Sequence, residues 1–307
     1  MSESTYILEG GVWKLVADGY IYESGAWKKI SGMYYWNGSA WVSSFSTGFT
    51  LAKTFSTGST NNYDIATEAT AAGWDGVAII NATLVIPSGA YIGSTSTGTY
   101  SLETTGIPTG STVNLTIDAG GFLVGRGGTG GSGAGSSVTA ASTGAVGGPA
   151  LNVITAIDFN LTNNGTIGGG GGGGGGGNGG DDWVVGAGFQ GGPGGGGAGF
   201  GTGGTYTNNA NASHMWSDPG GTGTHNSGGA GVGSAVKPGD ANNGSYGGTG
   251  GLGGSLGAVG NNGLNNGSGY YATYSSGSPG GAAGVAINGW STITALTEGV
   301  IHGAKNN

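Results

Sequence analysis

The chain has 307 residues, 79 of them glycine, and only 7% of its residues are charged. This composition departs from that of an ordinary globular domain, and the plentiful aromatic and β-branched residues argue against a generic disordered segment. The absence of cysteine excludes disulfides and thiolate metal sites, and a formal net charge of −8 argues against a nucleic-acid-binding protein.

A 14-residue repeat fills the N-terminal part of the chain, with units GVWKLVADGYIYES, GAWKKISGMYYWNG and SAWVSS. Each unit alternates aromatic and polar residues around a turn, which is typical of a β-hairpin. We therefore predict an attachment domain of aromatic hairpins, residues 1–48, whose aromatic face docks on another protein. The expected attachment and assembly residues are Trp13, Tyr20, Tyr22, Trp27, Tyr34, Trp36 and Trp41.

Residues 49–164 are predicted to form a β-rich domain of stacked strands. Its one helical signal, NNYDIATEATAAGWDG, has an asparagine cap, small and apolar residues on one face and a closing glycine, which predicts a short helix at 62–73. Three later segments, at 85–93, 116–125 and 160–168, repeat a strand–turn–strand pattern. Repeated units of this kind stack as layers of a sheet.

Residues 165–307 form the predicted glycine-rich domain, which opens with ten consecutive glycines at 168–177. Period three is the period of the extended left-handed polyproline-type helix. Because glycine lets backbones approach closely, we predict a rigid bundle of such helices that satisfy one another's backbone groups. Glycine recurs at every third position at Gly188, Gly191, Gly194 and Gly197, and at Gly248, Gly251, Gly254, Gly257, Gly260 and Gly263.

Four stretches of different composition interrupt the glycine runs: NGGDDWVVGA around Trp183, and residues 205–219, 234–246 and 264–279. Their aromatic, Asn, Ser and Asp residues are typical of adaptable binding loops. The simpler alternative is that they are turns that cover the ends of the bundle. The predicted receptor-binding residues are Trp183, Tyr206, Asn208, Asn209, His214, Trp216, Asp218, Tyr246, Tyr270, Tyr271 and Tyr274.

The alternation of IGGGGGGGGGGNGG, GFQGGPGGGGAGFG, GGAGVG and GGTGGLGGSLGAVGNNG with these loops resembles the tip adhesins of T-even-type bacteriophage tail fibres. The resemblance covers about residues 165–292. It implies a sandwich of polyglycine II helices whose exposed distal loops bind outer-membrane proteins or surface polysaccharide. The preceding segment, from AAGWDGVAII to GGFLVGRGG, resembles the region before the glycine-rich tips of many phage tail proteins. The expected fold is thus mostly β, with hairpin repeats, a β-layer middle region with one short helix, and a polyglycine II bundle.

We expect no enzyme activity, cofactor or metal. GRGGTG at 125–130 fits a dinucleotide-binding fingerprint but is followed by glycine, serine and alanine in place of a helix. His214, Asp218, His225, Asp181 and Asp182 could in principle form a metal site, but their spacings match no helix-based or ribbon pattern of metal ligands. A glycosidase would need two positioned carboxylates, and the aspartates of the loops, including Asp240, keep that alternative open.

The leading hypothesis is a tail-fibre or tail-tip adhesin that binds a host outer-membrane protein or glycan. Its other expected partners are tail or fibre proteins, with a homotrimer as the expected assembly. The start MSESTYILEGGVW has no basic or long apolar segment, so we expect a virion protein made in the host cytoplasm without a signal peptide and without membrane insertion. The alternatives are a structural virion protein, such as a capsid or tail decoration or a fibre component, and an ice-binding slab.

Overall fold

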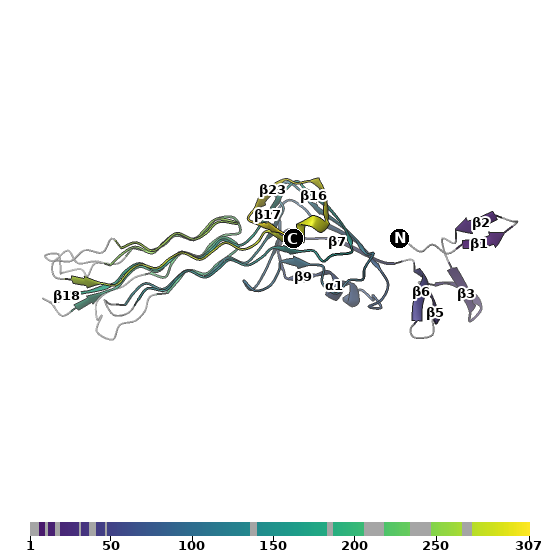
Figure 1. Ribbon diagram of the computed structural model, residues 1–307, viewed down its shortest axis with the longest axis horizontal. Helices are drawn as coiled ribbons and strands as arrows, with labels where there is room; N and C mark the ends of the chain where they lie inside the picture. Colours follow the sequence, from purple (N-terminus) through teal and green to yellow (C-terminus); the bar gives the residue numbers. More distant parts are fainter. Residues whose placement is uncertain are drawn as a thin grey trace.

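The structure is a computed structural model with three parts along its longest axis (Figure 1). Small hairpins lie at one end, a three-sided prism of parallel sheets follows, and a bundle of extended glycine-rich segments reaches away from the prism. A mostly β protein with one short α-helix is confirmed. The structure describes residues 6–9, 12–15, 19–30, 32–36, 41–46, 48–135, 140–182, 187–205, 218–233, 247–265 and 272–307.

Each tryptophan of the N-terminal repeat lies in an antiparallel hairpin. In the central hairpin Tyr22 lies opposite Trp27, and the turn residues Ser24 and Gly25 have φ of 55° and 84°. Two successive positive φ angles match the twist of the flanking strands, which favours a tight turn. The hairpins are β1 (Tyr6–Glu9) with β2 (Val12–Leu15), β3 (Gly19–Glu23) with β4 (Ala26–Ile30), and β5 (Gly32–Trp36) with β6 (Trp41–Ser46).

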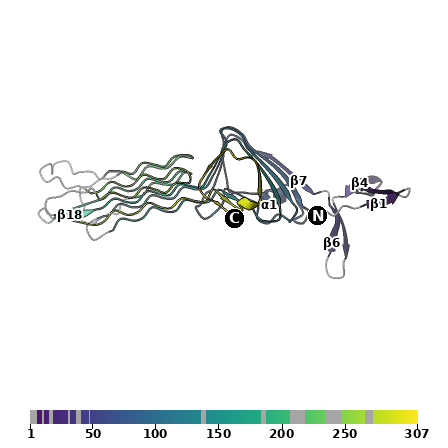
Figure 2. The same ribbon diagram turned by 45° about the horizontal axis from the view of Figure 1, so that its top comes forward.

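The prism consists of three parallel sheets of five strands each. Sheet one contains β7 (Phe49–Thr54), β10 (Ile80–Ile86), β13 (Thr112–Ile117), β16 (Asp158–Asn163) and β22 (Ile293–Thr297). Sheet two contains β8 (Gly58–Asn61), β11 (Ala90–Gly93), β14 (Phe122–Val124), β17 (Thr166–Gly168) and β23 (Val300–His302). Sheet three contains β9 (Tyr63–Asp64), β12 (Leu102–Glu103), β15 (Leu151–Asn152), β21 (Ile287–Asn288) and β24 (Lys305–Asn306). The chain visits the sheets in this order five times, so each circuit is one coil of the prism (Figure 2).

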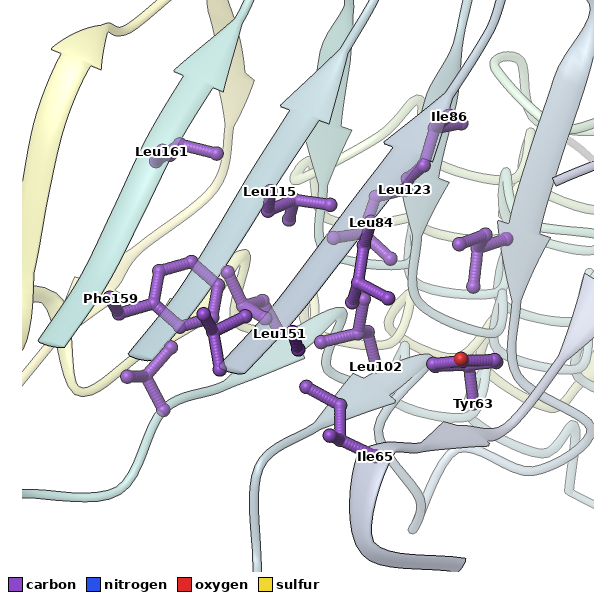
Figure 3. Packing of buried hydrophobic residues seen from close by; sticks show 14 of the residues in the cluster. Tyr63, Ile65, Leu84, Ile86, Leu102, Leu115, Leu123, Leu151, Phe159 and Leu161 are labelled. Carbon is purple, nitrogen blue, oxygen red and sulfur yellow. The ribbon is translucent and has the colours of Figure 1, made fainter. Parts of the chain in front are cut away.

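Alternation along the strands fills the inside of the prism with apolar side chains. In β10, Leu84 and Ile86 are fully buried. Leu84 lies opposite Leu115, and Leu115 lies opposite Leu161, so one position of successive coils forms a stacked column (Figure 3). Burying one such side chain contributes on the order of 2 kcal/mol, so repetition of the column stabilises the parallel stack.

The short helix predicted at 62–73 is observed as α1 (Ile65–Ala71). Its N-cap is Asp64, whose Oδ1 accepts a 2.6 Å hydrogen bond from the amide of Thr67. The asparagines expected to cap it lie earlier in the chain, so the helix begins later than predicted. A 3-10 helix, η1 (Trp290–Thr292), precedes the last coil. Among the described residues, no helix is long and apolar enough to span a bilayer.

The glycine bundle grows from one corner of the prism, between sheets two and three (Figure 2). Residues 125–150 connect β14 to β15, and residues 169–286 connect β17 to β21. The segment 287–307 falls within the predicted glycine-rich domain, 165–307, but returns to the prism as β21–β24. Conversely, residues 128–134 and 142–148, which precede the expected domain, lie in the bundle, where they exchange backbone hydrogen bonds with the central glycine run.

The polyglycine run lies at the centre of the bundle. Its amides donate in a threefold alternation to carbonyls of three neighbouring segments, 142–148, 192–198 and 258–264. The donors to these segments are Gly170, Gly173 and Gly176 for the first, Gly171, Gly174 and Gly177 for the second, and Gly172, Gly175 and Asn178 for the third.

The carbonyls of the same run accept from three further segments, 128–134, 248–254 and 278–284. Three donor and three acceptor neighbours surround the run on six sides. A Cβ atom placed on any glycine of 169–177 would lie less than 3.0 Å from a neighbouring backbone carbonyl atom. The run is therefore glycine because no direction is open for a side chain.

The glycines that recur at every third position face inward. The amides of Gly248, Gly251 and Gly254 donate to carbonyls of the central run, at Asn178, Gly175 and Gly172 respectively. Between them, Leu252 is 52% exposed. At Gly248–Gly254 this outer segment thus keeps glycine where it donates to the central run, and its large side chain, Leu252, meets solvent.

Candidate functional site

A small antiparallel sheet lies at the end of the bundle remote from the prism, where β18 is labelled (Figure 1). It consists of β19 (Ala187–Phe189), β18 (Gly180–Asp182) and β20 (Ala272–Tyr274), in that order. Its middle strand, β18, directly continues the central polyglycine run. The buried centre of the bundle therefore leads into the middle of this distal sheet.

Hydrogen bonds fix the two segments beside β18. The amide of Ser275 donates to the carbonyl of Gly179 at 2.9 Å, and the amide of Gly179 donates to the Ser275 hydroxyl at 2.9 Å. Just before them, the amide of Asn178 donates to the carbonyl of Leu264 at 3.2 Å, and its own carbonyl accepts from Gly248 at 2.7 Å. The segments that flank residues 234–246 and 266–271 therefore end beside β18.

The other interrupted segments end at the same level. The amide of Gly191, which follows β19, donates to the carbonyl of Ala134 at 2.9 Å. The amide of Gly133 in turn donates to the carbonyl of Thr205. The chain next to all four predicted loops is thus brought together at the distal end, although the loops are far apart in sequence.

Most predicted receptor-binding residues lie outside the described residues: Trp183, Tyr206, Asn208, Asn209, His214, Trp216, Tyr246, Tyr270 and Tyr271. Asp218 is described and exposed. Tyr274 lies in β20, opposite Gly180. Asp181 and Asp182 lie in β18, at the distal end.

His225 lies at the opposite end of the bundle, against the prism. Its ring centroid is 4.6 Å from that of Phe122 and 6.3 Å from that of Tyr91, and both of these residues belong to sheet two. It therefore cannot join the distal aspartates in a metal site. Among the described residues, no group of three or more His, Cys, Asp or Glu side chains is placed to hold a metal ion.

Aromatic contacts hold the near end of the bundle on the prism. The Phe200 ring meets Tyr91 edge-on at 5.2 Å, although Phe200 has a φ of 61°, which is uncommon for a bulky residue. Leu256 and Val124 are buried in the same cluster. Burial raises the pKa of Tyr91 from 10.0 to about 12.

Asparagine side chains outside the predicted receptor-binding residues support the distal segments. Asn262 Oδ1 accepts from the amide of Gly280 at 3.1 Å, and Asn265 Oδ1 accepts from the amide of Gly277. Both bonds tie neighbouring segments together near the distal sheet. The sequence signal was present, because both asparagines lie at the base of a predicted loop.

Comparison with known proteins identifies the family. The family model described as phage tail fibre adhesin Gp38 matches residues 50–306, which is most of the chain. The chain belongs to this family. As a tail fibre adhesin, it is a protein of the virion tail and a member of an adhesin family, not of an enzyme family.

The adhesin also resembles a solved structure, the gp37-gp38 adhesin tip complex of the bacteriophage S16 long tail fiber. The sequences are 24% identical, the TM-score is 0.50, and the match covers 85% of this chain and 83% of that chain. At this identity the likeness bears on the fold. No curated protein matches the chain significantly.

Proposed function

We propose that this adhesin binds a host surface receptor with the loops at the distal end of its bundle. The observation that carries the proposal is the convergence of the segments beside all four loops at one level, around β18. Loops separated in sequence can form one contact surface only if a scaffold brings their bases together. The bundle does this with a core of backbone hydrogen bonds, and rigid scaffolds of this kind position binding loops well.

We propose that the bundle is a sandwich of polyglycine II helices. The threefold alternation of donors and acceptors along residues 169–178 supports this, because a helix with three residues per turn and no internal hydrogen bonds presents its backbone groups in three directions. Such a core needs no disulfides or large apolar side chains. It suits a receptor-binding tip in a chain without cysteine.

The receptor is proposed to be an outer-membrane protein or a surface glycan. Aromatic rings stack on sugar faces and fill pockets between protein loops, and they dominate the binding energy of many interfaces. The proposed contacts are Trp183, Tyr206, His214, Trp216, Tyr246, Tyr270, Tyr271 and Tyr274, with hydrogen bonds from Asn208, Asn209 and Asp218.

The N-terminal hairpins are proposed to attach the adhesin to a fibre protein. Trp27 is 71% exposed and Tyr22 is 62% exposed, and their rings lie 5.3 Å apart. A large exposed aromatic pair of this kind marks an interaction surface. The structurally similar gp38 is found in complex with gp37, which supports a fibre protein as the partner. The repeat has further aromatic residues at equivalent positions, which are proposed to belong to the same attachment surface: Trp13, Tyr20, Tyr34, Trp36 and Trp41. That the adhesin forms a homotrimer stays a prediction.

Binding of labelled protein to a panel of intact bacteria tests the function. One variant replaces residues 206–217 and 266–271 by short Gly-Ser turns, and a matched variant carries Trp27→Ala in the hairpins. We expect the loop variant to lose selective binding while circular dichroism stays unchanged, and Trp27→Ala to keep it. Equal binding by the loop variant would contradict the proposed receptor surface, whereas no binding of the wild type to any host would favour a structural role.

A further inference from the structure

The prism has two open ends, because the strands of its first coil and of its last coil each have a hydrogen-bonded neighbour strand on one edge. Within the described residues, β7, β8 and β9 pair only with the second coil, and β22, β23 and β24 pair only with the fourth. Unpaired strand edges are ready templates for pairing with another chain. A second copy of this chain would offer matching edges.

In the last coil, Lys305 occupies a position that is apolar in the coils before it. It lies opposite Ile287, which lies opposite Leu151, and both of these side chains are fully buried. The Lys305 Nζ lies 4.0 Å from the ring centroid of Trp290 and 3.3 Å from Glu298 Oε2. The column thus ends in an ammonium group that contacts Trp290 and Glu298, where the preceding coils carry a buried apolar side chain.

In the first coil, Lys53 likewise occupies the terminal position of a column that is apolar in the next three coils, here in sheet one. It lies opposite Leu84, which begins the buried series of Leu115 and Leu161. Lys53 itself is exposed. A further coil stacked on this end would cover the ammonium group with apolar side chains, and burying an unpaired charge is strongly unfavourable.

The distribution of basic residues makes this placement specific. The chain contains seven lysine and arginine residues. They are Lys14, Lys28, Lys29, Lys53, Arg126, Lys237 and Lys305. The prism strands β7–β17 and β21–β24, all of them described, contain only Lys53 and Lys305, one in each terminal coil.

We propose that Lys53 and Lys305 are end caps that keep the prism of one adhesin from pairing end to end with the prism of a second copy. Inward-placed lysines at sheet edges are an established means of blocking edge-to-edge association. The last coil adds two further obstacles, a register shift beside Leu161 and a β24 of only two residues. With both ends of the prism blocked in this way, the N-terminal hairpins would make the contacts to other adhesin chains or to the fibre.

The test replaces both lysines by methionine in the full chain, Lys53→Met with Lys305→Met, since methionine keeps the unbranched stem and removes the charge. Molar mass is measured by light scattering over a wide range of concentration, beside hydrogen exchange of the terminal strands. We expect the mass to rise at least twofold above that of the wild type, whose chain mass is 29.3 kDa, with slower exchange in β7 and β22. The matched variant with arginine at both positions keeps the charges and is expected to behave as wild type.

Three results would overturn the proposal. The methionine variant could keep the wild-type mass and exchange at every concentration, or the arginine variant could associate to the same degree. The methionine variant could also lose its circular dichroism signal without associating, in which case the lysines serve folding and not exclusion. Lys305→Met alone, measured in the same way, separates the contribution of the last coil from that of the first.

Discussion

The amide of Gly174 donates a 2.7 Å hydrogen bond to the carbonyl oxygen of Gly195, a residue of a neighbouring segment of the bundle. A Cβ atom on Gly174 would lie less than 3.0 Å from backbone atoms of Gly251. We therefore expect Gly174→Ala to destabilise the bundle by about 3 kcal/mol, because the backbone at Gly251 and Leu252 would have to move. Leu252→Ala, at an outward position, should change stability by no more than about 0.5 kcal/mol. Thermal unfolding compares the two, and equal melting temperatures would contradict a closely packed centre.

Asn163 ties the fourth coil to the last coil. Its side chain is fully buried, and its Nδ2 donates to the carbonyls of Glu298 at 2.6 Å and Val300 at 3.3 Å. Its Oδ1 accepts from the amide of Gly165 at 3.1 Å. Asn163→Ala removes all three hydrogen bonds and leaves the buried amide of Gly165 without this partner, so we expect a loss of about 2–3 kcal/mol in the free energy of unfolding.

The matched control for this prediction is Asn160→Ala in the same strand. Asn160 lies on the outer face, where its Nδ2 donates to Asn114 Oδ1 at 3.1 Å. Water can replace that bond, so the change should cost less than about 1 kcal/mol. Chemical denaturation measures both variants. A loss for Asn163→Ala no larger than the loss for Asn160→Ala would refute the role of Asn163 as the link to the last coil.

The hydroxyl of Tyr63, which is labelled in Figure 3, is buried without a hydrogen-bond partner among the described residues. The Tyr63 ring meets Phe55 edge-on, with ring centroids 4.8 Å apart. Tyr63→Phe keeps the ring and removes the unpaired oxygen, so we expect it to stabilise the prism by about 1 kcal/mol. Tyr63→Leu, which also removes the ring contact, should destabilise it. Denaturation midpoints decide between these expectations, and a destabilised Tyr63→Phe would show that the hydroxyl is satisfied after all.

Alkaline pH should weaken the folded state through two tyrosines. Burial, with a smaller effect of Glu68, raises the pKa of Tyr63 from 10.0 to about 12, and burial raises that of Tyr91 from 10.0 to about 12. Between pH 10 and pH 12 these two tyrosines are deprotonated in the unfolded chain and still protonated in the folded chain. Their contribution to the free energy of unfolding is therefore fully present below pH 10 and is lost as the pH rises toward 12. Unfolding measured across this range should show a steeper fall for the wild type than for a variant with phenylalanine at both positions. Parallel profiles would contradict the burial of these hydroxyls.

Local patterns in the sequence were sufficient to predict several elements. The tryptophan repeat predicted hairpins, and glycine at every third position predicted which faces of the outer segments meet a neighbour, as at Gly251. The closure of the prism was not predictable in the same way. Parallel pairing joins strands far apart in the chain, and β21 and β24 have two residues each, too few to show a period.

The candidate site shows the same division. Composition indicated loops around Trp183 and within 205–219, and the structure places the chain beside them at one end of the bundle. Composition could not show that His225 lies against the prism, because the direction of each segment depends on hydrogen bonds between distant residues. Asn163 was missed for a related reason, since an asparagine inside a strand looks like an outward-facing residue until the last coil is added.

Binding of the Trp216→Ala, Tyr271→Ala double variant to host bacteria tests the central claim most directly. Its control is Leu252→Ala with Val259→Ala, which truncates two exposed apolar side chains, 52% and 63% accessible, away from the distal loops. We predict that the loop variant loses affinity about tenfold or more with unchanged circular dichroism, while the control binds as wild type. Full binding by the loop variant, or an equal loss in the control, would contradict a receptor surface at the distal loops.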